Sequence, residues 1–195
     1  MPPWLVSDPG HKVVRFKAGR VEYVLGLGCG TATSAALYYL LYYPNAVVLG
    51  IDRNQDEAWV RGHLPSWVQS RFFFVNADVR DLSVARLDEL VREHLGVPLS
   101  KLTRIHWNPS CVTLSRASRG WPRYRDAFSN PTHPLSVPDD EVFDAGVRLI
   151  LALCRMALSL CCSIENPAGE HFSHLPGVRL LLRDRSWRLL CGSHC

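Results

Sequence analysis

The chain has 195 residues and a formal net charge of +4, with 47% hydrophobic and 21% charged residues. This length suits one domain with a substantial core, and the composition is ordinary for a globular protein. No apolar stretch reaches the ~18 residues of a membrane-spanning helix, and residues Met1 to Trp4 lack the basic and apolar pattern of a secretion signal.

Apolar runs and helical repeats alternate along the chain. Residues 1–20 contain several prolines, including a Pro-Gly pair, and are expected to form an irregular lead-in. After this segment the pattern predicts, in chain order, a strand over 21–25, a helix over 31–43, a strand over 46–51, a helix broken at Pro65 over 56–68 and a strand over 71–76. The first strand runs directly into a glycine turn over 26–30.

The second half of the chain continues the same alternation. It predicts, in chain order, a helix over 83–95, a strand over 102–107, a long polar loop over 112–137, a helix over 139–158, a strand over 160–164, a short helix over 175–183 and a last strand over 187–190. Strands that alternate with helices indicate an α/β fold. We therefore expect a doubly wound, mostly parallel sheet with helices on both faces, as one domain over residues 21–195.

The turn after the first strand has the features of a nucleotide-cofactor site. Gly26, Gly28 and Gly30 let the backbone turn tightly and approach a ligand. Asp52 follows the second strand, where an acid binds ribose hydroxyls, and Asp78 follows the third, where it is expected to hold an adenine amino group. The third glycine comes too early for G-x-G-x-x-G, and no Gly-Lys-Ser/Thr follows as in a P-loop. This spacing of glycine turn, acid and second acid resembles that of Rossmann-like S-adenosylmethionine-dependent methyltransferases, a resemblance that favours S-adenosylmethionine over NAD as the cofactor.

Two short segments follow later strands: Asn108-Pro109-Ser110-Cys111 and Glu165-Asn166-Pro167. Because parallel strands collect their carboxyl ends at one edge, both segments are expected to share a cleft with the glycine turn. Cys111, with Arg116 and several hydroxyl side chains nearby, is expected to be a nucleophilic thiolate. Glu165 ends a strand of apolar residues and cysteines, so we expect burial to raise its pKa and keep a proton available at neutral pH.

Positive charge gathers in and around the long polar loop. The segment from residue 104 to residue 125 contains five arginines and three interleaved aromatic residues: Arg104, Arg116, Arg119, Arg123 and Arg125, with Trp107, Trp121 and Tyr124. Arginines beside aromatic rings suit contacts to phosphates and bases, whereas the alternative is a solvated basic loop. The position directly after the candidate thiol favours a nucleic-acid contact.

The seven cysteines are an odd number and are spread through the predicted strands and helices. This pattern indicates reduced thiols in the nucleus or cytoplasm rather than disulfides. Apart from Cys111, they are expected to be small core residues or incidental. The His and Cys groups at 171–174 and 191–195 lack a paired C-x-x-C arrangement, so no metal site is predicted. His106 is expected to be a packed histidine rather than a catalytic base.

The segment from Pro109 through Cys111 to Ala117 resembles the Pro-Pro-Cys loop of DNA cytosine-5 methyltransferases. Glu165-Asn166-Pro167 resembles the Glu-Asn-Val or Glu-Asn-Pro segment of the same family, and the motifs stand in the family's order. The resemblance implies a Rossmann-like class I methyltransferase that binds S-adenosylmethionine and DNA, with RNA left open. It implies that Cys111 attacks C6 of a flipped cytosine while Glu165 assists at N3, which activates C5 to take the methyl group.

The same resemblance assigns nucleic-acid contacts to Ser115, Arg116 and Arg119. Ser110 stands where the family usually has its second proline. The chain ends at Cys195, before the positions of the family's Arg-x-Arg segment and target-recognition region. We therefore expect a truncated catalytic domain that lacks the target-recognition region.

Two other functions stay open. The segment Asn108 to Cys111 partly resembles the Asn-Pro-Pro-aromatic motif of methyltransferases that act on the adenine amino group, in which the asparagine holds the amino nitrogen. The second open function is a module that binds S-adenosylmethionine or nucleic acid without turnover. In that case Cys111 is a small core residue and Glu165 a capping or ion-paired acid.

Overall fold

The structure is a computed structural model, and it describes residues 20–29, 40, 43, 45–53, 56–110, 124–126, 130–156, 160–165, 170–184 and 186–187. Most of the predicted helix over 31–43 and most of the predicted strand over 187–190 lie outside the described residues. The same is true of five residues assigned to the candidate site: Gly30, Cys111, Ser115, Arg116 and Arg119.

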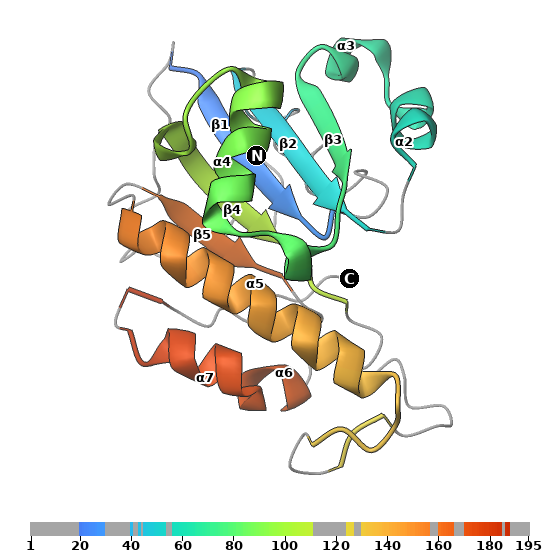
Figure 1. Cartoon of the computed structure of the whole chain (residues 1–195), viewed down its shortest axis with the longest axis vertical. Coiled ribbons are helices and arrows are strands. Elements are labelled where there is room, and N and C mark those ends of the chain that lie inside the picture. Colours follow the sequence, from blue (N-terminus) through green and yellow to red (C-terminus); the bar gives the residue numbers. More distant parts are fainter. Residues whose placement is uncertain are drawn as a thin grey trace, which may run out of the picture.

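A five-stranded parallel sheet forms the centre of the molecule (Figure 1). Its strands are β1 Glu22–Leu27, β2 Ala46–Asp52, β3 Phe72–Asn76, β4 Leu102–Trp107 and β5 Cys161–Ile164. Their order in the sheet is β3-β2-β1-β4-β5, and every neighbouring pair is parallel. The strand order reverses direction between β1 and β4, which is where open α/β sheets bind ligands. The predicted α/β fold with a parallel sheet is confirmed.

Helices cover this sheet on both faces. They are α2 Glu57–His63, α3 Ser66–Gln69, α4 Val84–Leu95, α5 Ser136–Met156, α6 Glu170–His174 and α7 Pro176–Leu182, with the 3-10 turns η1 Val79–Asp81 and η2 Leu99–Lys101. Helices α4 and α5 lie across one face, and α7 packs on the outer side of α5 (Figure 1). None of the helices that the structure describes is long and apolar enough to cross a membrane.

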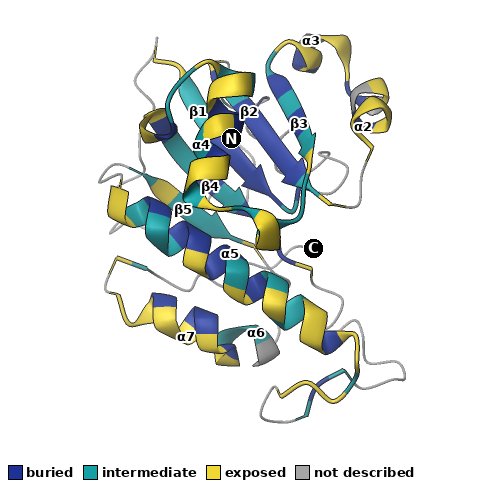
Figure 2. Ribbon diagram, in the orientation of Figure 1, coloured by how far each residue is buried: buried dark blue, intermediate teal, exposed yellow. Residues whose placement is uncertain are grey.

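Alternate residues of the central strands build two separate cores. Leu25 and Leu49 pack with α4 and α5, whereas Val24 and Val48 pack on the opposite face of the sheet. The first core takes its helical side chains from Leu87, Leu90 and Val91 of α4 and from Phe143, Val147 and Ile150 of α5. The second takes them from Leu40, Val60 and Val68, and Leu64, between α2 and α3, packs with them. Figure 2 shows the central strands buried between these layers. Because both faces are covered, the strands appear in the sequence as nearly continuous apolar runs.

Helix α5 lies unusually close to β4. A Cβ atom at Gly146 would overlap the ring of Trp107, so only glycine lets the helix approach that side chain. Trp107 is buried and stacks on Phe143 of the same helix, with 5.0 Å between the ring centroids. The helix begins at Ser136, three residues before the predicted start at Asp139. Its first residue is fixed because the Ser136 hydroxyl donates to the Tyr124 carbonyl oxygen at 2.7 Å.

Candidate functional site

Strands β1, β2, β4 and β5 finish in one row, which we call the carboxyl edge. Leu27 pairs with Ile51 on one side and with Trp107 on the other, and Trp107 pairs with Ile164. The ladder continues through backbone hydrogen bonds from Gly28 N–H to Ile51 O (2.8 Å), from Asn108 N–H to Leu27 O (3.0 Å) and from Glu165 N–H to Trp107 O (2.9 Å). The carboxyl edge therefore brings together the glycine turn and the start of both motif segments, as a parallel sheet predicts.

The turn after β1 depends on Gly28. Its φ of +59° lies in the left-handed region that favours glycine. A Cβ at this position would also overlap the carbonyl oxygen of Asn108 at the end of β4. Gly26 differs, because a Cβ there would lie 3.7 Å from the Cβ of Cys29, which is ordinary contact. The bare backbone of Gly28 therefore lets the turn after β1 pack directly against the end of β4.

Cys29 and Asp52 lie beside this turn. Burial raises the pKa of the Cys29 thiol to about 12, and the charge of Asp52 acts in the same direction. A thiol of this kind stays protonated at neutral pH, so Cys29 is the small core residue that the sequence predicts. Asp52 is half-buried at the tip of β2. This position fits a ribose-binding acid, which stays a prediction for this residue.

Asp78 is held by two arginines. Its Oδ1 accepts from the backbone N–H and the Nε of Arg80 (2.9 and 3.1 Å), while Oδ2 accepts from Arg80 Nη2 (2.8 Å) and Arg53 Nη1 (3.1 Å). The hydrogen bonds from Arg80 hold the pKa of Asp78 well below its ordinary value. A carboxylate has about four lone-pair sites, and these contacts fill them. An adenine amino group at Asp78, as the sequence predicts, would therefore have to displace Arg53.

The segment that leads to Cys111 starts at the carboxyl edge and turns toward α5. Pro109 is buried and Ser110 is exposed, and the Ser110 hydroxyl donates to Oδ2 of Asp139 in the first turn of α5 at 3.3 Å. The side-chain Oδ1 of Asn108 is buried beside the His106 imidazole, and no hydrogen bond of normal geometry reaches it among the described residues. An acceptor of this kind is costly to leave unpaired, so it marks a place where a ligand can donate.

His106 joins Glu165 to the sheet, a connection that the sequence analysis missed. The imidazole lies between the two strands: Nδ1 is 2.7 Å from the Ser163 hydroxyl oxygen, and Nε2 is 3.4 Å from Oε2 of Glu165. Burial lowers the pKa of His106, and the negative charge of Glu165 opposes that shift. The expected burial of Glu165 is wrong, because half of its side chain is exposed. The sequence shows that His106 and Glu165 each lie near the end of a strand. Only the register of β4 and β5 shows that the two side chains meet.

A serine, a histidine and a carboxylate in a row are the parts of a nucleophilic triad, but the burial here is reversed. A triad has an exposed nucleophile and a buried acid. Here Glu165 is the exposed member, whereas Ser163 is half-buried within β5 and its hydroxyl also approaches the carbonyl oxygen of Ile105 (3.5 Å). The arrangement of Ser163, His106 and Glu165 therefore leaves Glu165 as its exposed member at the carboxyl edge and does not present Ser163 as a nucleophile.

Two of the five arginines expected around the loop have structural roles. The guanidinium of Arg104 lies over the ring of Tyr43, 5.6 Å from its centroid. The Arg125 side chain is only 1% exposed and forms an ion pair with Asp140 of α5. These contacts give both guanidinium groups partners within the protein, and contact of the loop with nucleic acid stays a prediction. The others, Arg116, Arg119 and Arg123, lie outside the described residues.

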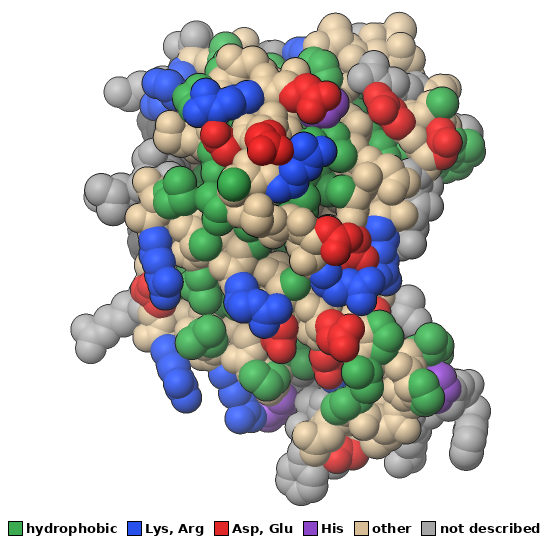
Figure 3. Space-filling view, viewed as in Figure 1, with side chains coloured by type: hydrophobic (Ala, Val, Ile, Leu, Met, Phe, Trp, Pro, Cys, Tyr) green, Lys and Arg blue, Asp and Glu red, His purple; other side chains and the backbone are tan. Residues whose placement is uncertain are grey.

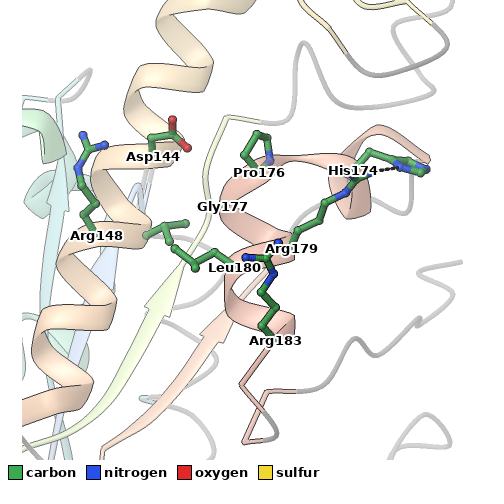
Figure 4. A pocket seen from close by; sticks show the side chains of 9 residues that line it. Asp144, Arg148, His174, Pro176, Gly177, Arg179, Leu180 and Arg183 are labelled. Atoms are coloured by element: carbon green, nitrogen blue, oxygen red, sulfur yellow. Dashed lines mark hydrogen bonds between the residues drawn. The ribbon is translucent and has the colours of Figure 1, made fainter.

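A shallow cavity of about 590 Å³ lies away from the carboxyl edge, between α5 and α7. Figure 4 shows Arg179 extended along α7 to His174, with 2.9 Å between Nη2 and Nδ1, while Arg148 points away from α7. The basic side chains around this cavity therefore do not converge on one point. Figure 3 shows basic and acidic side chains interspersed on this face of the molecule. Within the described ranges, no group of three His, Cys, Asp or Glu side chains could hold a metal ion.

Comparison with known proteins identifies the fold. A UDP-glucose-4-epimerase from Stenotrophomonas maltophila, solved with bound NAD, matches with a TM-score of 0.52 and 14% identity over 83% of this chain and 48% of that chain. A dTDP-glucose 4,6-dehydratase from Bacillus anthracis, solved with NAD, has a TM-score of 0.49 and 10% identity over 83% and 49% of the two chains. The aminoglycoside resistance methyltransferase NpmB1 has a TM-score of 0.35 and 22% identity over 66% and 50%.

The likeness to the epimerase and the strand order together establish a Rossmann-like α/β fold, and a shared fold does not establish the chemistry. The chain spans about half the length of these three structures. No family model matches the chain, and no curated protein matches it.

Proposed function

We propose that this chain is an S-adenosylmethionine-dependent methyltransferase of the DNA cytosine-5 kind. One observation carries the proposal: the register of β1, β4 and β5 sets Gly28, Asn108 and Glu165 side by side at the carboxyl edge. Asn108 begins the segment that contains Cys111. The cofactor turn, the segment with the candidate thiol and the segment with the candidate carboxyl therefore all begin at the carboxyl edge. An enzyme that brings a methyl donor to a base held by a thiol needs this arrangement.

The residues at the turn fit the cofactor. Gly28 lets the turn after β1 pass directly against the Asn108 carbonyl at the end of β4, and Asp52 stands at the tip of the neighbouring strand β2, where it can accept from ribose hydroxyls. The absence of a third glycine at the dinucleotide spacing favours a ligand without a pyrophosphate. When bound, S-adenosylmethionine supplies an electrophilic methyl group.

The protein's own groups would act on the base. Cys111 adds as a thiolate to C6 of a flipped cytosine, which forms the S–C6 bond and moves electron density to C5. Glu165 donates a hydrogen bond or a proton to N3, which stabilises the charge that develops on the ring. After C5 has taken the methyl group, a base removes the C5 proton and the S–C6 bond breaks. Ser115, Arg116 and Arg119 would contact the nucleic-acid backbone and position the flipped nucleotide.

A second candidate function has one observation in its favour. The buried Oδ1 of Asn108, which no hydrogen bond of normal geometry reaches among the described residues, suits the exocyclic amino group of a base. In an amino-group methyltransferase this asparagine would hold the nitrogen that attacks the methyl group. Such an enzyme has no use for a thiol at Cys111, which has no aromatic face to stack on the base.

Covalent trapping separates these functions. The protein is incubated with S-adenosylmethionine and DNA that contains 5-fluorocytosine, whose fluorine cannot be removed as the proton is, and an SDS-resistant adduct is measured. We expect an adduct that disappears in Cys111→Ser and persists in Cys161→Ser, which changes an exposed cysteine of β5. If no adduct forms while radiolabelled methyl groups reach adenine or cytosine amino groups, the second function holds. Binding of S-adenosylmethionine without any methyl transfer would indicate a module that binds the cofactor without turnover.

A further inference from the structure

Two cysteines from different elements lie in direct contact on one face of the sheet. Cys154 belongs to the last turn of α5 and Cys162 to β5, and their Sγ atoms are 3.4 Å apart. Both side chains are half-buried and pack against the first core, between the helix and the sheet, and both are free thiols. The sequence assigns them only as small core residues, because it does not show that the two side chains meet.

The other described cysteines differ from this pair. Cys29 is buried on the opposite face of the sheet, and burial raises the pKa of its thiol to about 12. Cys161 is exposed, and as the strand neighbour of Cys162 it points to the opposite face. Its Sγ lies 3.9 Å from Nη1 of Arg104. Within the described part of the chain, Cys154 and Cys162 are thus the cysteines whose sulfur atoms meet.

The contact makes the two thiols unequal. The hydrogen bond between them favours a thiolate at Cys154 and a thiol at Cys162, so it lowers the pKa of Cys154 and raises the pKa of Cys162. Burial and the charge of Asp184 oppose the lowering at Cys154. Because the thiolate is the nucleophilic form of cysteine, Cys154 is the member of the pair that attacks first.

Little movement is needed to join the two sulfur atoms. A disulfide bond is about 2.05 Å long, so the sulfur atoms have to approach by about 1.3 Å. Cys154 lies two residues before the end of α5, and helix ends adjust more readily than helix interiors. Cys162 lies on β5, which forms one edge of the sheet and pairs there with β4 alone. Both partners therefore belong to parts of the fold that can take up a small shift.

We propose that Cys154 and Cys162 form a redox-active dithiol site that takes hydrogen peroxide as its oxidant and closes to an intramolecular disulfide. The Cys154 thiolate attacks one peroxide oxygen: an S–O bond forms, the O–O bond breaks, and the leaving oxygen takes up a proton and departs as water. The Cys162 sulfur then gives up its proton and attacks the sulfenic acid, which forms the S–S bond, breaks the S–O bond and releases a second water.

The reaction balances within the pair and its oxidant. The two thiols lose two electrons and two protons, and hydrogen peroxide gains them as two molecules of water. An external thiol such as glutathione reduces the disulfide again by thiol–disulfide exchange. In the disulfide form the last turn of α5 is joined covalently to the edge strand. This site is separate from Cys111 and does not depend on the proposed function.

Peptide mapping tests which sulfur atoms join. The reduced protein is treated with hydrogen peroxide, the remaining thiols are alkylated, and tryptic peptides are analysed by mass spectrometry. Trypsin separates residues 149–155, which contain Cys154, from residues 156–179, which contain Cys161 and Cys162. We expect these two peptides to be linked within one chain, and dithiothreitol to reverse the link. Absence of this link, whatever happens at the other cysteines, overturns the proposal.

Two variants identify the partner of Cys154. The matched control is Cys161→Ser, which changes the neighbouring cysteine on the opposite face, and the link should persist in it. In Cys162→Ala the link should disappear, and Cys154 should instead accumulate a sulfenic acid that dimedone traps. A link that is lost in Cys161→Ser, or that forms only between two chains, contradicts the proposal. The map of the wild-type protein decides even where a variant folds poorly.

Alkylation rates test the order of attack. Iodoacetamide at neutral pH should modify Cys154 about fivefold more slowly in Cys162→Ala than in the wild-type protein, because the thiolate has lost the thiol that donates to it. The rate should be unchanged in Cys161→Ser. Equal rates in all three proteins would overturn the assignment of Cys154 as the first nucleophile.

Discussion

At the scale of single residues, two glycines assigned to the cofactor turn differ in what a side chain would do: Gly28 lies in the turn, whereas Gly26 lies within β1. Gly28 has a left-handed backbone and no room for a Cβ beside the Asn108 carbonyl, whereas Gly26 has room. We expect Gly28→Ala to lower the free energy of unfolding by about 2 kcal/mol or more, through backbone strain and the overlap with β4. Gly26→Ala should cost clearly less.

Urea denaturation of the two variants measures this difference, and calorimetric titration with S-adenosylmethionine measures the effect on the site. Gly28→Ala should also weaken cofactor binding more than Gly26→Ala, since it moves the backbone that borders the ligand. Equal effects of the two substitutions on both quantities would show that the turn does not depend on Gly28.

The residue scale also shows why some site predictions were incomplete. The sequence places Asp78 after a strand, and that is correct, but it does not show that Arg53 and Arg80 occupy the carboxylate. Glu165 was expected to be buried because the preceding strand is apolar. Its exposure follows from its place one residue beyond the end of β5, where the sheet no longer covers it. His106 was set aside as a packed histidine because one sequence cannot give the register that brings it to Glu165.

At the scale of elements, the contact between α5 and β4 sets the position of the segment that precedes the helix. Gly146 lies against the Trp107 ring, and any Cβ there would push the helix away from the sheet. Gly146→Ala should therefore destabilise the protein by about 1–3 kcal/mol, as overpacking of a tight core does. Gly62→Ala in α2 is the matched control.

Apart from the backbone of α2 and the two chain neighbours, no atom of the described residues lies within 4 Å of the Cβ position at Gly62, so alanine should be neutral or stabilise the protein by up to about 1 kcal/mol. Thermal unfolding followed by circular dichroism compares the two variants. A stabilising effect of Gly146→Ala would mean that α5 lies farther from β4 in solution than it does in the structure.

Most elements could be predicted because each has a clear local signal. Helix α4 shows this best: apolar residues recur at helical spacing after Ser83, and the Ser83 hydroxyl accepts from the N–H of Arg86 at 3.1 Å, as the sequence predicts. Helix α6 was not predicted because its five residues are too few for a helical repeat. The early start of α5 was missed because Pro138 resembles a loop residue, although proline is well tolerated in the first turn of a helix.

At the scale of the whole molecule, a buried ion pair joins a loop segment to α5. The Arg125 side chain is 1% exposed and that of Asp140 is 30% exposed, and the pair fixes residues 124–126 beside the start of the helix. Asp140→Asn would remove the carboxylate that pairs with the buried Arg125 guanidinium, so we expect a loss of about 3–5 kcal/mol in the free energy of unfolding.

The control for this substitution is Glu89→Gln, which breaks the exposed pair between Arg86 and Glu89 on α4. Exposed pairs contribute little, so the control should change stability by less than about 1 kcal/mol. Guanidinium chloride would screen both pairs, and urea is the better denaturant for the comparison. Similar losses in the two variants would show that the Arg125 pair is no stronger than a surface contact.

The order of the strands has a consequence for how the protein is made. β1 is the first strand that the structure describes, and it pairs on one side with β4. Gly28 therefore meets Asn108 only after some eighty further residues have been added, and Glu165 arrives later still. Contacts that join distant parts of a chain form slowly. Cofactor binding should therefore be among the last properties that a refolding or nascent chain acquires. The moment at which it appears would show when β4 and β5 have paired with the rest of the sheet.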